Sequence, residues 1–302
     1  MIGVTNVLLI VNPVSGRQKA KEILYKIIDF LCRNNCKTIV FSTTGKGEAT
    51  ALVVAHGAGC DKIICCGGDG TLNEVFAGLA SLELKVPVGY IPTGTSNDMA
   101  RSLGLNQNTK RAIHTALNGI ETDLDIGVFN EHYFSYVASF GAFTKASYET
   151  PQWLKNYMGR ASYYLYSLSE IADIRPLAVK VVADGVEING EFVFGSVSNS
   201  TVFGGMPIFA DGSISLNDGK FEVILIKPVK GAKDLQSIFQ GMFMQEYNEE
   251  SVIFLTASQL TFSFDEDIPW TVDGEYAGDC REVNIRNLHR MVTVLALGHN
   301  KI

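Results

Sequence analysis

The sequence predicts two domains, an α/β domain with a parallel sheet followed by an antiparallel β domain. Through residue 117, short apolar runs alternate with stretches whose apolar residues recur at helical spacing, which is typical of strands joined by crossover helices. Beyond residue 125, short apolar runs separated by turn signals replace this pattern. We therefore expect domains at residues 1–126 and 127–288, with residues 289–302 returning to the first domain.

Four strands, each followed by a helical pattern, are expected in the first domain. Short apolar runs place the strands at residues 7–11, 38–41, 63–66 and 86–91. Apolar residues at intervals of three and four place helices at residues 23–31, 49–55, 72–79 and 109–117. Such an order gives a parallel sheet, because each helix returns the chain to the start of the next strand.

The second domain contains one helical stretch, residues 151–171, among short strands. Phe221, Val223 and Leu225 alternate with Glu222, which predicts a strand with one face on the core. Five dipeptides that favour positive φ predict hairpin turns. They are Asp184-Gly185, Asn189-Gly190, Asp211-Gly212, Asp218-Gly219 and Asp273-Gly274.

The composition excludes some classes of protein. The chain has 302 residues, of which 46% are hydrophobic and 19% charged, as in folded globular proteins. A formal net charge of −7 argues against nucleic-acid binding, which needs a positive surface. The six cysteines lack zinc-site spacing, and no apolar run or leader pattern predicts a membrane span or signal peptide. We expect a cytoplasmic protein with reduced thiols.

Three glycine-containing segments each follow a predicted strand. They are Asn12-Pro13-Val14-Ser15-Gly16, Gly67-Gly68-Asp69-Gly70-Thr71-Leu72-Asn73-Glu74 and Pro92-Thr93-Gly94-Thr95-Ser96-Asn97-Asp98. Phosphate oxygens are held well by backbone N–H groups, and glycine lets the backbone approach them closely. Any one segment alone could be a tight turn, and Asp98 could be a helix cap. Three in succession at strand ends predict a nucleotide site.

These motifs, in this order, resemble the diacylglycerol kinase catalytic domain, and most of all its bacterial soluble lipid kinase branch. Segments 217–221 and 272–275 also fall where that family has similar ones, so the resemblance covers nearly the whole chain. It implies a nucleotide domain like those of phosphofructokinases and NAD kinases, with helices on both faces of its sheet, and a C-terminal antiparallel β-sandwich. Cys66 and Met99 depart from the family's usual Gly and Phe.

The resemblance implies that ATP is bound by the three segments and by a threonine that follows the second strand. The implied residues are Asn12, Pro13, Val14, Ser15, Gly16, Thr43, Gly68, Asp69, Gly70, Thr71, Leu72, Asn73, Glu74 and Thr95. Asp69, Asp98 and Asp125 would lie near the phosphates and a catalytic Mg²⁺, whose preferred ligands are oxygen atoms.

The resemblance also implies a structural Mg²⁺ at the Asn217-Asp218-Gly219 turn. Its ligands would be the carboxylate of Asp218 and the backbone carbonyl groups of Ser215 and Lys220. The alternative is an ordinary hairpin turn without a metal.

Asp273-Gly274-Glu275 offers two carboxylates beside a glycine. Similar kinases place the proton acceptor at the glutamate, so Glu275 is expected to act as the base and Asp273 to orient it. Residues two apart on a strand share a face, and on this ground both side chains should point at one site. The alternative is an exposed Asp-Gly turn.

Together these features predict a kinase that transfers the γ-phosphate of ATP to a lipid hydroxyl in a cleft between the domains. Diacylglycerol, phosphatidylglycerol, a sphingoid base and an isoprenoid alcohol all remain open as acceptors. The alternatives are a kinase for a soluble acceptor such as NAD and an inactive nucleotide-binding regulator. The mixed aromatic and basic segment 153–160 suggests transient contact with a membrane surface. An exposed edge strand could support a homodimer.

Overall fold

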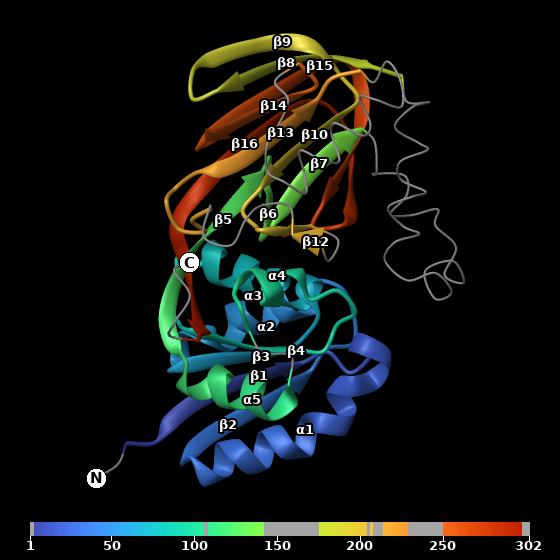
Figure 1. Cartoon of the computed structure of the whole chain (residues 1–302). Coiled ribbons are helices and arrows are strands. Elements are labelled where there is room, and N and C mark those ends of the chain that lie inside the picture. The colour runs from blue at the N-terminus through green and yellow to red at the C-terminus, as the bar shows by residue number, and fades with distance from the viewer. Residues whose placement is uncertain are drawn as a thin grey trace.

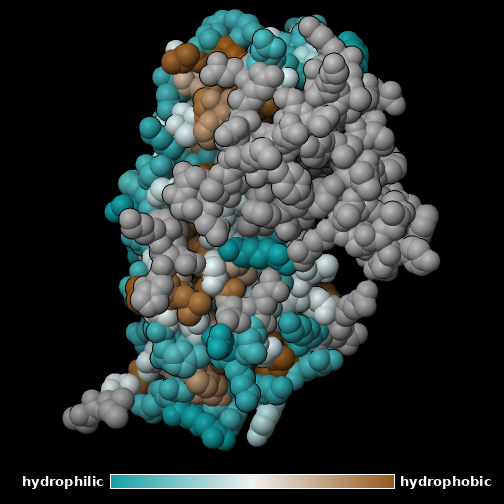
Figure 2. All heavy atoms as spheres, viewed as in Figure 1, coloured by the Kyte–Doolittle hydropathy of each residue, from teal (hydrophilic) through white to brown (hydrophobic). Residues whose placement is uncertain are grey.

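A computed structural model describes residues 3–105, 108–141, 175–203, 206–207, 214–228 and 250–297. The α/β domain and the β domain are stacked end to end (Figure 1). The helix predicted at 151–171, the membrane-contact segment 153–160 and the Asp211-Gly212 turn lie outside the described residues. On the side shown in Figure 2, the described surface is largely hydrophilic, with small separate hydrophobic areas.

The first domain contains the predicted parallel sheet, in the order β4-β3-β1-β2. The four strands are β1 (Thr5–Val11), β2 (Cys36–Ser42), β3 (Lys62–Gly67) and β4 (Val88–Pro92). Each overlaps the range expected from the apolar runs, which confirms the prediction. In the register, Val11 pairs with Cys66 and Gly67 pairs with Pro92, so the carboxyl ends of β1, β3 and β4 lie along one edge.

Helices cover both faces of this sheet (Figure 1). They are α1 (Ser15–Arg33), α2 (Glu48–His56), the 3₁₀ turn η1 (Gly57–Gly59), α3 (Asp69–Ser81), α4 (Asp98–Ser102) and α5 (Thr109–Asn118). Side chains alternate across a strand. Val7 and Leu9 of β1 therefore pack in one core with α1 and α5, whereas Leu8 and Ile10 pack in another with α2 and α3. Helix α4, which the sequence pattern did not predict, follows Asn97 with a φ of 50°.

The second domain is built of antiparallel strands, as expected. Their bounds are β5 (Ile120–Phe129), β6 (His132–Phe134), β7 (Val137–Gly141), β8 (Leu177–Ala183), β9 (Val186–Phe192), β10 (Phe194–Ser198), β11 (Val202–Phe203), β12 (Met206–Pro207), β13 (Phe221–Ile226), β14 (Val252–Ala257), β15 (Gln259–Val272) and β16 (Glu275–Ala296). Fully buried Trp270 is central to the core, with the ring centroids of Phe129, Phe140 and Phe262 at 4.9–5.3 Å.

Two long strands join the parts of the molecule. β15 pairs with β8 through residues 260–264 and with β7 through residues 270–272. β16 pairs with β15 and β5 and then, at Val294, with Val88 of β4 in parallel. Register shifts interrupt the pairing of β16 with β15 and its pairing with β5, as expected where a long strand bends. The domain boundary expected at residue 126 falls inside β5.

Two local predictions in the β domain are wrong. Asn189-Gly190 lies within β9, paired with residues 179–180 of β8, so strand pairing overrides its turn preference. β13 is buried on both faces: Phe221 packs with the aromatic core, whereas Ile224 packs in the core that includes first-domain residues. Asp184-Gly185 and Asp273-Gly274 do form positive-φ turns between paired strands.

Candidate active site

The three glycine segments lie together at the carboxyl edge of the parallel sheet. The backbone N–H of Asn12 donates to Cys66 O over 2.9 Å, and that of Thr93 donates to Gly67 O over 2.8 Å. These bonds tie the first segment to Cys66, the residue directly before the second segment, and tie the second segment to the third. The arrangement follows from the parallel order of β4, β3 and β1, since neighbouring parallel strands end at the same edge.

Glycine is required where these segments touch. A Cβ on Gly94 would lie 2.7 Å from Gly68 Cα, which is too close for any side chain. Gly16 has a φ of +55°, and a Cβ there would lie 1.7 Å from Thr93 O. The backbones therefore approach one another, and would approach a ligand, more closely than other residues permit.

Two helices begin at these segments without a side-chain cap. Val14 precedes α1 and Gly68 precedes α3, and neither helix start receives a capping hydrogen bond from its N-cap side chain. Asn12 instead orders the first segment, since its Oδ1 accepts from Val14 N at 3.1 Å and its Nδ2 donates to Thr71 Oγ1 at 3.0 Å. Helix starts of this kind present N–H groups that suit phosphate oxygens.

Other residues predicted to bind ATP have varied surroundings. Thr43 is buried and its N–H donates to Val11 O, whereas Thr95 is exposed on the third segment. Leu72 is fully buried in the core. The carboxylate of Glu74 accepts from Gly47 N at 2.7 Å and from Ala49 N at 3.1 Å, so it caps the start of α2.

Asp69 and Asp98 lie side by side. The carboxylate of Asp69 accepts from the N–H groups of Asp98 and Met99, at 3.0 and 3.2 Å, and so supports the first turn of α4. Burial raises the pKa of Asp69, and those hydrogen bonds oppose the rise. Asp98 is 2% exposed. Half-buried Asp69 and buried Asp98 both place negative charge at the start of α4, and a cation would stabilise that charge.

Tyr136, which the sequence did not single out, lies among the acidic residues of both domains. Burial raises the pKa of its hydroxyl group well above the usual value, and the charges of Asp273, Asp69, Asp98 and Glu275 raise it further. Four of the five carboxylates predicted to be catalytic, all but Asp125, are therefore close enough for their charges to act on one phenol. No local sequence signal marks Tyr136, because only tertiary contacts bring these groups to it.

Asp273 holds the segment that carries Tyr136. Its carboxylate accepts from Ser135 N at 2.8 Å, Ser135 Oγ at 2.9 Å, Tyr136 N at 3.0 Å and Val137 N at 3.0 Å. Burial raises the pKa of Asp273 to about 6 against these hydrogen bonds. The expectation that Asp273 and Glu275 share a strand face is wrong, because Asp273 and Gly274 are turn residues with φ of 50° and 81°.

Glu275 extends toward the first domain. A Cβ on Gly70, in the first turn of α3, would lie 4.0 Å from Glu275 Oε1. Its other oxygen, Oε2, forms an ion pair with the ammonium group of Lys46, from the loop between β2 and α2. Sequence reasoning missed Lys46, since a single lysine in a loop carries no signal of its partner.

Asp125 contacts the Ser215–Lys220 turn. Its carboxylate accepts from Gly219 N and from Arg290 N, each over 2.6 Å, and it is 1% exposed. Burial raises its pKa, and both hydrogen bonds oppose the rise. The structure thus joins Asp125 to this turn and to β16 through direct hydrogen bonds.

The predicted ligands of the structural metal lie around the same turn. Asp218 Oδ1 accepts from Lys220 N at 3.0 Å, and Gly219 has a φ of 83°. Glu222, 4% exposed, has an oxygen without a hydrogen-bond partner, and burial raises its pKa to about 8, with Asp218 and Asp125 adding to the rise. Carboxylate and carbonyl oxygens such as those of this turn are the ligands that Mg²⁺ prefers. Within the described ranges, no group of three or more His, Cys, Asp or Glu side chains is arranged to hold a metal.

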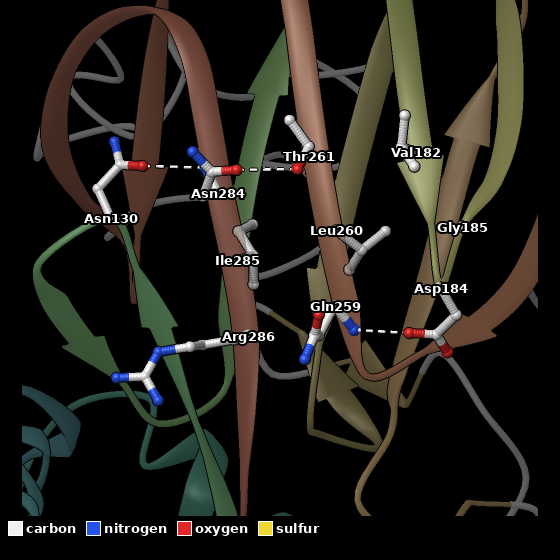
Figure 3. Close-up of a pocket in the computed structure, with 10 residues that line it drawn as sticks. All are labelled: Asn130, Val182, Asp184, Gly185, Gln259, Leu260, Thr261, Asn284, Ile285 and Arg286. Atoms are coloured by element: carbon white, nitrogen blue, oxygen red, sulfur yellow. Dashed lines mark hydrogen bonds between the residues drawn. The ribbon is translucent and has the colours of Figure 1, made fainter.

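A hollow on the β domain is lined by none of the residues predicted to be catalytic, ATP-binding or metal-binding (Figure 3). Its polar groups bond largely to one another, as when Asn284 N donates to Asn130 Oδ1 at 2.9 Å and Thr261 Oγ1 donates to Asn284 Oδ1 at 2.8 Å. The location of the candidate site therefore follows from the converging segments and carboxylates and not from this hollow.

Across the part of the chain that is described, no helix is long and apolar enough to cross a membrane.

Comparison with known proteins matches both domains. Residues 6–129 match the family model of the diacylglycerol kinase catalytic domain, and residues 137–296 match that of the YegS C-terminal NAD kinase beta sandwich-like domain. A diacylglycerol kinase of Bacillus subtilis (strain 168) is 34% identical over 272 residues, 89% of each chain. One from Staphylococcus aureus (strain MRSA252) is 32% identical over 95% of this chain and 91% of its own.

A solved structure agrees with these matches. The crystal structure of a diacylglycerol kinase from Bacillus anthracis str. Sterne superposes with a TM-score of 0.81 at 26% identity, covering 99% of each chain. Both domains and their arrangement are thus shared along nearly the full length. The chain belongs to the bacterial branch of the diacylglycerol kinase family.

Proposed function

We propose that this lipid kinase transfers the γ-phosphate of ATP to the hydroxyl group of diacylglycerol or a related lipid, in a cleft between the two domains. The observation that carries the proposal is the meeting of three glycine segments from one domain with Asp273 and Glu275 from the other. Phosphoryl transfer depends mainly on positioning and charge neutralisation, which N–H donors and carboxylates around a cation can supply.

ATP would bind at the carboxyl edge of the sheet, with its phosphates against the first turns of α1 and α3. Backbone N–H groups of Gly16 and Gly68–Gly70 would be the main donors, and Asn12 and Thr71 would hold the first two segments together. Thr43 and Thr95 would line the remaining sides. Glu74 would act indirectly, by fixing the start of α2.

Magnesium would serve two roles. Asp69 and Asp98 would hold the catalytic ion, and Asp218, with the carbonyl groups of Ser215 and Lys220, would hold the structural one. When bound, the catalytic ion neutralises charge on the phosphates. Asp125 accepts the N–H of Gly219 and thereby shapes the turn of the structural site.

Glu275 would accept the proton of the lipid hydroxyl group as that oxygen bonds to the γ-phosphorus. Its carboxylate reaches toward Gly70 at the start of α3, where the phosphates are expected. Asp273 would act through the backbone, since its four hydrogen bonds position residues 135–137 and with them Tyr136.

The acceptor follows from the relatives, which are named diacylglycerol kinases. A lipid acceptor implies work at the membrane surface, and we place the protein in the cytoplasm with transient membrane contact. A homodimer could form along β2, the edge strand of the parallel sheet, where Ile39 and Val40 are exposed.

The test is a panel of acceptors with γ-labelled ATP and Mg²⁺. Diacylglycerol, phosphatidylglycerol, a sphingoid base and an isoprenoid alcohol would be offered in mixed micelles, with NAD as the soluble acceptor. Label in diacylglycerol or a related lipid supports the proposal. Label in NAD alone would indicate a soluble-acceptor kinase, and ATP binding without transfer to any acceptor would indicate a regulator.

A further inference from the structure

The loop between β2 and α2 lies at the same sheet edge as the glycine segments. It starts at Thr43, whose N–H donates to Val11 O over 2.9 Å, directly before the first segment. It ends at Gly47, whose N–H donates to Glu74 Oε1 over 2.7 Å, on the helix that begins at the second segment. Both ends of the loop are thus attached to the candidate nucleotide site, and Lys46 lies between them.

Lys46 forms an ion pair with Glu275, a residue 229 positions later in the chain and in the other domain. The side chains are 79% and 59% exposed, so solvent screens the attraction and the pair contributes little to stability. An exposed ammonium group on a flexible stem can change partner at small cost. The pair therefore adds little to the stability of the fold, and its importance comes from its position beside the candidate nucleotide site.

The surroundings of Lys46 carry excess negative charge. Its ion-pair partner Glu275 is one of four carboxylates whose charges act on Tyr136, and the others are Asp69, Asp98 and Asp273. The hydrogen bond and charge of Glu275 raise the pKa of Lys46, and the charge of Glu74 raises it further. A triphosphate entering this region adds several more negative charges. A cationic side chain within reach would stabilise this added charge together with the metal ion, and Lys46 is a cation directly beside the proposed base.

We propose that Lys46 is a phosphate-binding and positioning residue, whose ammonium group pairs with Glu275 in the free enzyme and with the γ-phosphate when ATP is bound. This inference rests on the proposed function. The exchange frees Glu275 for the acceptor hydroxyl group. The acceptor oxygen then bonds to the γ-phosphorus, the bond from that phosphorus to the β–γ bridging oxygen breaks, the hydroxyl proton passes to Glu275, and ADP leaves.

Nucleotide binding without lipid tests the exchange. Affinity is measured by calorimetry for ADP and for an ATP analogue whose β–γ bridging oxygen is replaced by methylene. Lys46→Met should weaken binding of the analogue roughly tenfold, the loss of one charge-assisted hydrogen bond, and change ADP binding less than about twofold. Lys46→Arg keeps the charge and should lose less than about threefold for the analogue.

Lys37, exposed near the opposite end of β2, provides the matched control, and Lys37→Met should bind both nucleotides like the parent. Equal weakening for ADP and the analogue, no weakening for either, or an Arg variant as weak as the Met variant would overturn the proposal. Failure of the proposed function would look different, because the parent itself would then bind neither nucleotide or label no lipid.

Discussion

Asp273→Asn tests how burial and hydrogen bonding compete at the turn beside the proposed base. The parent carboxylate accepts four hydrogen bonds, yet burial raises its pKa to about 6. Since this pKa lies above that of the unfolded chain, the folded state holds the proton more tightly. The resulting stabilisation is complete below about pH 4 and is lost as the pH rises through about 6.

The magnitude follows from the shift. A rise of about two pKa units corresponds to about 3 kcal/mol, of which about 2 kcal/mol falls between pH 4.5 and pH 7.5. The amide of Asp273→Asn is neutral throughout this range. The free energy of unfolding of the parent, relative to the variant, should therefore fall by about 2 kcal/mol between these two pH values.

The assay is urea denaturation at pH 4.5 and 7.5, followed by tryptophan fluorescence, since Trp270 is buried in the β domain. Asp265→Asn, at an exposed position of β15, is the matched control and should follow the parent at both pH values. A parent that gains stability over the variant as the pH rises would refute the reasoning. The four hydrogen bonds would then outweigh burial.

Three further changes address separate parts of the proposed site. Glu275→Gln should lower kcat for lipid phosphorylation roughly a hundredfold and leave ATP affinity nearly intact, because only the proton acceptor is lost. Gly68→Val should raise the KM for ATP steeply, since its Cβ would lie 3.4 Å from Gly94 Cα, in the space between two segments. Asp218→Ala should lower the Tm in magnesium and remove the dependence of Tm on magnesium.

Each change has a contrary outcome. A Gln variant with the parental rate would rule out Glu275 as the base. A folded Gly68→Val that binds ATP like the parent would remove the second segment from the nucleotide site. A melting curve of Asp218→Ala that matches the parent with and without magnesium would leave an ordinary turn at 217–219.

The order of strands and helices in the first domain could be predicted from the sequence, because it depends on local periodicity. Val7 and Leu9 face one core and Leu8 and Ile10 the other, as strand alternation requires. The glycine segments could be placed as well, since each directly follows an apolar run. Parallel pairing then brings their ends to one edge without further information.

In the β domain, local residue preferences alone were insufficient to predict the turns and strands, because pairing with strands distant in sequence decides where they form. Asn189-Gly190 reads as a turn, but pairing with β8 keeps it in a strand. β16 looks locally like a β-domain strand followed by a returning tail, yet it is one strand of 22 residues that joins both domains. Hydrogen-bonded ladders of this length outweigh the preference of any single dipeptide.

The residues of the candidate site likewise fall into those that the sequence identified and those that only the structure brought together. Asp69, Asp273 and Glu275 belong to recognisable segments, so the sequence by itself determined which acids to consider. Only the tertiary structure decided that Asp273 holds residues 135–137, that Tyr136 lies among the acids, and that Lys46 meets Glu275. The reason is physical: these contacts join residues that are distant in sequence, by as many as 229 positions for Lys46 and Glu275, and no local pattern encodes which distant group a side chain will reach.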